Sequence, residues 1–207
     1  MVYGVPNLAE GADAIGRRLG VRPTPGGQHA GLGTANQLVG LGHDCYLEII
    51  GPDPNQPTPA GPRPFGLDTL TEPRLVTWAL RETDLDARVA ALRARAYDPG
   101  PVLDMHRVRA DGTRLAWRLA IRGPAIGGAM PHGDRLIPFL IDWGDTAHPA
   151  STLESTCRLL SVHARHPDPS VIRPLLAALD VPLDVERAPV AGLVATLRCP
   201  AGIIELS

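Results

Sequence analysis

The side chains best suited to chemistry lie between residues 26 and 51, in a glycine-rich segment that ends in an apolar run. His29, Thr34 and Asn36 supply an imidazole, a hydroxyl and an amide, and Glu48 follows inside the run CYLEII. A carboxylate in such a run is costly to bury unless it is paired, hydrogen-bonded or bound to a metal. Glu48 is therefore a candidate metal ligand or general base. A buried arginine or a backbone group that pairs with it is the competing interpretation.

The residues before Glu48 have two interpretations each. Gly26 and Gly27 permit a positive φ or a close approach of the backbone to another group. They place His29 near the mouth of a cavity, as a catalytic residue that contacts substrate or a ligand, or else in a surface loop. Thr34 and Asn36 are two residues apart on a strand, so both side chains point to one face. They either orient a substrate or bridge neighbouring strands.

The elements around these residues repeat along the chain. Each repeat is a strand, a capped helix, a hairpin and an apolar strand with an acid near its end. Asn7, Thr83 or Asp84, and Asp168 are the expected helix N-caps. Internal repeats of this kind indicate a fold built from similar units, here of the α+β class. The expected divisions are a first unit at 1–51, a proline-rich linker or lid at 52–73, a second unit at 74–143 and a third at 157–207.

Composition excludes several classes of protein. The net charge of the 207 residues is −2 and no basic stripe is present, so no nucleic-acid partner is expected. No apolar run is long enough to span a membrane, and we expect no signal peptide. Cys45, Cys157 and Cys199 lack metal-ligand or redox spacing, so reduced thiols and a cytoplasmic location are expected. Prolines leave 52–66 without a regular element.

Four runs together resemble a known group of proteins. GGQHAGLGTANQLVGLG, YLEIIGPD, the hairpin RADGTRLAWRLA and the strand PFLIDW are similar to the glyoxalase-like branch of the vicinal oxygen chelate superfamily. That superfamily includes glyoxalase I, extradiol dioxygenases and bleomycin-resistance proteins. The resemblance implies tandem βαβββ units whose mostly antiparallel strands curl into an open cup. We expect the units to pair within the chain, and because their number is odd, a homodimer is a further expectation.

The resemblance also implies a divalent metal in the cup, held by histidine on first strands and glutamate on closing strands. Glu48 matches the closing-strand glutamate of the first unit, and Glu205 is similarly placed in the third. His163 is the histidine nearest to a first-strand ligand position. The matching position falls before Met1 in the first unit and close to Thr77 in the second. Such a set of nitrogen and oxygen ligands suits Zn, Mn, Fe or Ni.

Two functions follow as hypotheses. In the first, the cup binds a small oxygen-bearing substrate for metal-assisted lyase, isomerase or dioxygenase chemistry, with Glu48 and His29 as catalytic residues. In the second, the cup is a non-catalytic binding site like that of antibiotic-sequestering proteins and needs no metal. Trp117 and Trp143 are expected to form the substrate-binding wall, with simple core packing as the alternative, and Trp78 could contribute in the second hypothesis. Outside this set we expect the histidines at 106, 132 and 148 to be loop or surface residues.

Overall fold

The structure is a computed structural model that describes residues 1–42, 44–108, 112–122 and 134–207. Its strands form a nine-stranded sheet and a four-stranded sheet. The elements in chain order are β1 (Val2–Gly4), α1 (Leu8–Leu19), β2 (Thr24–His29), β3 (Thr34–Gly40), β4 (Tyr46–Pro52), the 3-10 helix η1 (Pro64–Thr69), β5 (Arg74–Thr77), β6 (Ala79–Glu82), α2 (Leu85–Ala94), β7 (Val102–Val108), β8 (Arg114–Ala120), η2 (Asp134–Leu136), β9 (Phe139–Asp142), η3 (Pro149–Thr152), β10 (Arg158–His166), α3 (Pro169–Ala178), β11 (Asp184–Arg187), β12 (Gly192–Cys199) and β13 (Gly202–Leu206).

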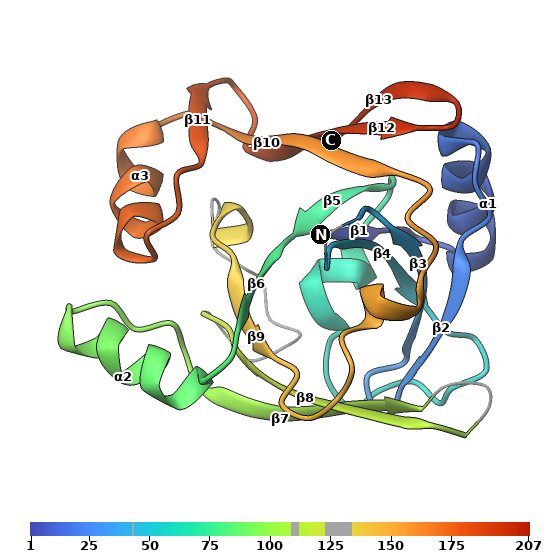
Figure 1. The fold of residues 1–207 in the computed structure, drawn as a ribbon, viewed down its shortest axis with the longest axis horizontal. Helices are drawn as coiled ribbons and strands as arrows, with labels where there is room; N and C mark the ends of the chain where they lie inside the picture. The colour runs from blue at the N-terminus through green and yellow to red at the C-terminus, as the bar shows by residue number, and fades with distance from the viewer. Residues whose placement is uncertain (43, 109–111, 123–133) are drawn as a thin grey trace.

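The nine-stranded sheet curls almost into a closed cup (Figure 1). Its strand order is β5-β1-β4-β3-β2-β7-β8-β9-β6, so β5 and β6 occupy opposite edges. These two strands are consecutive in the chain and only Trp78 separates them. A sheet whose two edges are joined by one residue must bend until those edges nearly meet. The predicted α+β class and the curved, mostly antiparallel cup are therefore confirmed.

The first two βαβββ units build the two halves of this cup. In each unit the first strand crosses over through a helix and pairs in parallel with the last, as β1 does with β4 and β6 with β9. The other pairs are antiparallel, and β2 joins β7 between the halves at Gln28 and Val108. The two halves of the cup therefore meet within one chain, as expected.

The helices begin where the sequence predicts. The side chains of Asn7, Asp84 and Asp168 each accept a hydrogen bond from a backbone N–H in the first turn of the helix that follows. Gly20 ends α1 in the left-handed conformation with φ 72°, which costs a glycine little. The 3-10 helix η1 overlaps the stretch 52–66, expected to be irregular, only at its end, where Phe65 and Gly66 have the non-helical φ values 58° and 72°.

The third unit has the predicted elements but a different strand order. Its sheet runs β11-β10-β12-β13, so the first strand, β10, lies between the second and third strands of the unit. β10 is parallel to β11 and antiparallel to β12. The closing strand β13 is therefore separated from β10 by β12, whereas β4 is the direct neighbour of β1.

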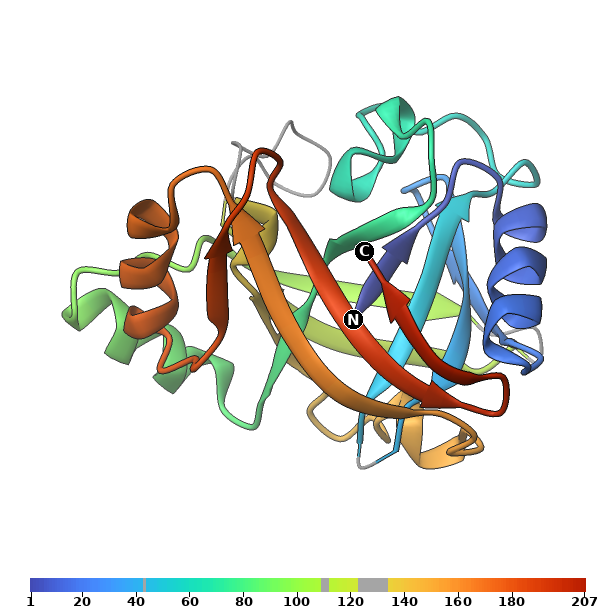
Figure 2. The same cartoon turned by 90° about the horizontal axis from the view of Figure 1, so that it is seen from above.

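Two groups of buried side chains lie on different sides of the curved sheet. One contains Tyr3, Leu47 and Ile49 of the cup strands together with residues of all three helices and of the four-stranded sheet. The other contains Val2, Ile50 and residues of β8 and β9, and it faces the inside of the cup. Figure 2 shows β10 and β12 crossing over the cup as long bent strands. No helix among the described residues is long and apolar enough to cross a membrane.

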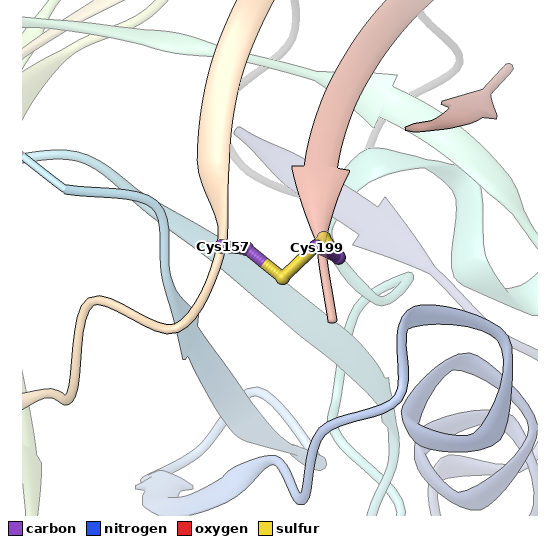
Figure 3. Close-up of a disulfide and its surroundings, with 2 residues drawn as sticks. All are labelled: Cys157 and Cys199. Atoms are coloured by element: carbon purple, nitrogen blue, oxygen red, sulfur yellow. A yellow bond between two sulfur atoms is a disulfide. The ribbon is translucent and has the colours of Figure 1, made fainter. Parts of the chain in front are cut away.

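A disulfide joins the two longest strands of the four-stranded sheet (Figure 3). Cys157 precedes β10 and Cys199 ends β12, and the neighbouring residues Arg158 and Arg198 are paired across the sheet. The expectation that all three cysteines are reduced thiols is therefore wrong for this pair. The two half-cystines are 42 residues apart in sequence, and only the antiparallel pairing of β10 with β12 brings them together. Cys45 is the free cysteine of the described chain.

Candidate functional site in the cup

A cavity of about 200 Å³ lies inside the cup. The pleat of the sheet decides which side chains reach it, because directly paired residues of antiparallel strands point to the same face. His29 is paired with Thr34 across β2 and β3, and Leu38 of β3 is paired with Glu48 of β4. Thr34, Asn36 and Leu38 alternate along β3. The predicted polar residues of the first unit therefore share the inner face, and His29, Asn36 and Glu48 line the cavity itself.

Asn36 is the centre of a hydrogen-bond network at the floor of the cavity. Its Oδ1 accepts hydrogen bonds from the backbone N–H of Gly27 at 3.0 Å and from Nη1 of Arg107 at 3.2 Å. Two donors on one side fix the orientation of the amide, so Nδ2 faces the other way. There it donates to Oε1 of Glu48 and lies 3.4 Å from Nε2 of His29. The carboxylate of Glu48 thus receives a hydrogen bond from the amide of Asn36.

His29 is held neutral by its surroundings. Its ring is buried, with 6% of its surface exposed, and burial lowers its pKa, partly opposed by the negative charge of Glu48. Nδ1 lies 2.9 Å from Oγ1 of Thr34, and Nε2 lies 3.7 Å from Oε1 of Glu48. With Nε2 accepting from the Asn36 amide, Nδ1 carries the hydrogen and donates it to Thr34. His29 thus lies deep in the cup and not in a surface loop.

Gly26 and Gly27 are required by close approach. Neither residue has a positive φ. A Cβ built on Gly26 would overlap Oδ1 of Asn36 and lie 2.7 Å from Nη1 of Arg107. A Cβ on Gly27 would lie 2.5 Å from the backbone oxygen of Val108, at the junction between the two halves of the cup. These glycines were expected to allow either a positive φ or a close approach of the backbone to another group. The second role is the one that the structure shows.

Aromatic side chains form the opposite wall of the cavity. The rings of Trp117 and Trp143 lie 5.1 Å apart, and Trp117 meets His29 edge to face at 6.3 Å. Trp143 also meets His148 at 5.9 Å. The indole N–H of Trp143 is buried and has no hydrogen-bond partner among the described residues. Trp143 lines the cavity while only 5% of its surface is exposed.

Among the cavity residues that were not predicted from the sequence, three bear on its chemistry. Arg107, which is 2% exposed, brings a positive charge to the floor. Tyr46 and His148 line the cavity and pack on each other with ring centroids 5.4 Å apart. Burial and the negative charge of Glu48 raise the pKa of the Tyr46 phenol, which stays protonated at neutral pH. The expectation that His148 is an ordinary loop or surface residue is wrong, because it is 9% exposed and faces the cavity; the histidine at 132 lies outside the described residues.

The side chains predicted to bind a metal do not converge. His163 on β10 and Glu205 on β13 belong to the four-stranded sheet and do not line the cavity that contains Glu48. Glu205 is exposed and is paired with Thr196 of β12. The different strand order of the third unit is the physical reason, because it moves the closing strand away from the first. Thr77, the position matching a first-strand ligand in the second unit, is buried on β5.

The remaining donors at the floor do not suit a divalent metal. Across the described part of the chain, no group of three His, Cys, Asp or Glu side chains is placed to hold an ion. Between His29 and Glu48, the two candidates that do meet, the Asn36 amide N–H occupies the position that a cation would need. The guanidinium of Arg107 adds a positive charge to the same cluster, which further disfavours a cation.

The cup and its lined cavity define a protein of the glyoxalase type, with the general role of binding small molecules. The family model described as "Glyoxalase-like domain" matches residues 1–179, and the chain belongs to this family. A comparison with curated proteins finds no match. Among solved structures, a hypothetical protein from Staphylococcus aureus is similar, with a TM-score of 0.64 and 14% identity over 99% of this chain and 96% of that chain. At that identity the likeness concerns the fold alone.

Proposed function

We propose that the cup binds a small oxygen-bearing organic molecule without the help of a metal ion. The observation that carries this proposal concerns Trp143, which lines the cavity and whose buried indole N–H has no hydrogen-bond partner among the described residues. A buried donor without an acceptor costs about 1–3 kcal/mol. An oxygen atom of a ligand bound in the cavity would supply the missing acceptor.

The cavity also limits the size and character of this ligand. A volume of about 200 Å³ is slightly larger than a cavity of about 150 Å³ that holds benzene. Trp117, Phe139 and Ile141 offer apolar surface for the body of the molecule, while Arg107 and His29 offer polar groups at the floor. A compact ring or short chain with one or two oxygens fits this division.

Calorimetric titration with catechol and with toluene tests the proposal, because the two differ mainly in their oxygens. We expect catechol to bind and toluene to bind more weakly. Trp143→Phe should weaken catechol about 3- to 10-fold, the range for one neutral hydrogen bond, and should leave toluene unchanged. Trp78→Phe is the matched control, because Trp78 lies outside the cavity and its indole N–H already donates to the backbone oxygen of Leu136 at 2.8 Å. Equal affinities for catechol and toluene would contradict the proposal.

A second candidate function is proton transfer at a carbon next to a carbonyl. It is favoured by one observation: the Glu48 carboxylate and the neutral imidazole of His29 lie 3.7 Å apart in the same cavity. Glu48 would take the proton as a general base, and His29 would donate a hydrogen bond to the oxygen that gains charge, after exchanging its tautomer. Trp117 and Asn36 would orient the substrate.

Exchange of carbon-bound hydrogen for deuterium separates this candidate from simple binding. Hydroxyacetone in D₂O should exchange its methylene hydrogens faster with the protein than without it, as measured by NMR. Glu48→Gln should abolish the acceleration while catechol still binds. Exchange that persists in Glu48→Gln would assign the proton transfer to another group and contradict this candidate.

A further inference from the structure

A second cavity lies outside the cup, where the two sheets meet, and it is lined by basic side chains. Its volume is about 580 Å³. Arg74 at the start of β5, Arg135 in η2 and Arg165 in β10 all line it. Glu72 is the acidic side chain among the lining residues. Ser207, whose backbone oxygen accepts a hydrogen bond from the Leu75 N–H, also lines it and carries the carboxylate that ends the given sequence. Three guanidinium groups therefore outnumber the two carboxylates at this cavity, in a protein whose net charge is −2.

Buried leucines next to two of these arginines fix the backbone that carries them. Leu75 follows Arg74 and is 5% exposed, and Leu136 follows Arg135 and is 1% exposed. The short helix η2 contacts both β5 and β12, so it spans the boundary between the two sheets. Burial of the leucines fixes the backbone, and the arginine side chains are left at the cavity.

Two of the arginines lack a counterion within the described protein. The side chains of Arg74 and Arg135 form no hydrogen bond or ion pair with another described residue. Arg165 has a distant partner, with its Nε 4.0 Å from Oε2 of Glu186. Burial and the charge of Arg74 both lower the pKa of Arg135, which places the two guanidinium groups close enough to repel each other.

Arg135 is also confined on its other side. Gly66 in η1 has φ 72°, and a Cβ built on it would lie 2.7 Å from Nη2 of Arg135. One end of the Arg135 guanidinium therefore lies against the backbone of η1 at Gly66. Arg74 itself is exposed. Two like charges held near each other repel, and an anion between them removes that repulsion.

We propose that this basic cavity is a binding site for a compact anion with several negative charges, such as a diphosphate group. Guanidinium groups bind phosphate oxygens through paired, charge-assisted hydrogen bonds, which suits Arg74 and Arg135 on neighbouring elements. Arg165 supplies a third positive charge at the same cavity. The site is separate from the cup and does not depend on the function proposed for it.

Titration calorimetry with inorganic pyrophosphate tests the site, with sodium chloride added to hold the ionic strength constant. We expect one pyrophosphate per chain and a loss of at least about 10-fold in affinity in the double variant Arg74→Gln/Arg135→Gln. Pyrophosphate at ten times its Kd should also raise Tm by about 3–6 °C in the unchanged protein and not in the variant. Citrate, titrated in parallel, distinguishes a phosphate ligand from a polycarboxylate.

Arg158→Gln/Arg198→Gln is the matched control. These two exposed arginines are paired across β10 and β12, and neither lines the basic cavity. The control removes the same charge and should bind pyrophosphate like the unchanged protein. Tighter binding of citrate than of pyrophosphate would assign a polycarboxylate to the site. Absence of binding by both anions, or an equal loss in the control, would overturn the proposal.

Discussion

Replacement of Asn36 by aspartate tests the network at the floor of the cup most directly. The two side chains have nearly the same shape, so the change affects charge and hydrogen bonding with little effect on packing. An aspartate can still accept hydrogen bonds from the Gly27 N–H and from Arg107. It cannot donate to Glu48, and it places a second carboxylate within hydrogen-bond distance of Oε1.

The size of the expected loss of stability follows from the proton that the two carboxylates would share. Two carboxylates in contact do not both ionise in a buried site, so one pKa of the pair rises by several units in the folded state. In the unfolded chain both groups titrate near pH 4. A folded pKa above its unfolded value contributes stability that is lost as pH rises through the folded value. With a rise of two to three units, Asn36→Asp should cost about 3–4 kcal/mol at pH 8, relative to its own stability at pH 4.

Urea denaturation at pH 5 and at pH 8 measures this difference. The loss caused by Asn36→Asp should be clearly larger at pH 8, after subtraction of the change seen in the unchanged protein. Gln37→Glu is the control, because residue 37 is the next one on β3, points to the opposite face and gains the same charge. A loss in Asn36→Asp that is independent of pH, or no larger than that in Gln37→Glu, would refute the assigned network.

Two further predictions concern His29 and the disulfide. Burial lowers the pKa of His29, so the unfolded chain binds a proton more readily than the folded protein does, and stability should fall as pH drops below about 6.5. In a denaturation series over pH, His29→Gln should make this fall shallower, while His106→Gln, outside the cavity, should not. Equal slopes in the two variants would contradict the assignment. Reduction of the Cys157–Cys199 disulfide, which closes a separation of 42 residues, should lower the free energy of unfolding by up to about 4 kcal/mol. Unfolding measured with and without reductant checks this, Cys45→Ser should show the same difference, and no effect of reductant would contradict it.

Local patterns were enough to predict the repeated units and the α+β class, and the resemblance to a known superfamily implied the cup. The N-caps at Asn7, Asp84 and Asp168 and the alternation of apolar residues act within a few positions of the chain, so they are visible in a sequence. Repetition of the same pattern then indicated tandem units. The strand order of the third unit could not be predicted from such patterns, because α3 and its flanking strands allow more than one pairing. Contacts with the rest of the protein, such as those of β12 with β5, favour one order, and the local sequence pattern does not reveal these contacts.

The candidate site was predictable to the same extent. Thr34 and Asn36 share a face because of the pleat, and that argument needs only one strand. Arg107 was harder to predict. Met105 and Arg107 alternate toward the cavity, but the register of β7 against β2 decides that Arg107 reaches Asn36. The pairing of Cys157 with Cys199 likewise depends on the register of β10 and β12. Sequence reasoning missed Arg107 and the disulfide because both depend on the register of distant strands.

The position of Glu48 in the fold and its chemistry can now be separated. Its place on the last strand of the first unit follows from the fold, as the resemblance implied. The partners of its carboxylate do not follow from the fold. The Asn36 amide donates a hydrogen bond to this carboxylate and accepts one from Arg107. The cost of burying the carboxylate is thus met within the protein, which leaves the indole N–H of Trp143 as the buried donor still in need of an acceptor among the described cavity residues. We therefore expect a ligand oxygen to accept a hydrogen bond from Trp143, beside the polar groups that Arg107 and His29 offer at the floor.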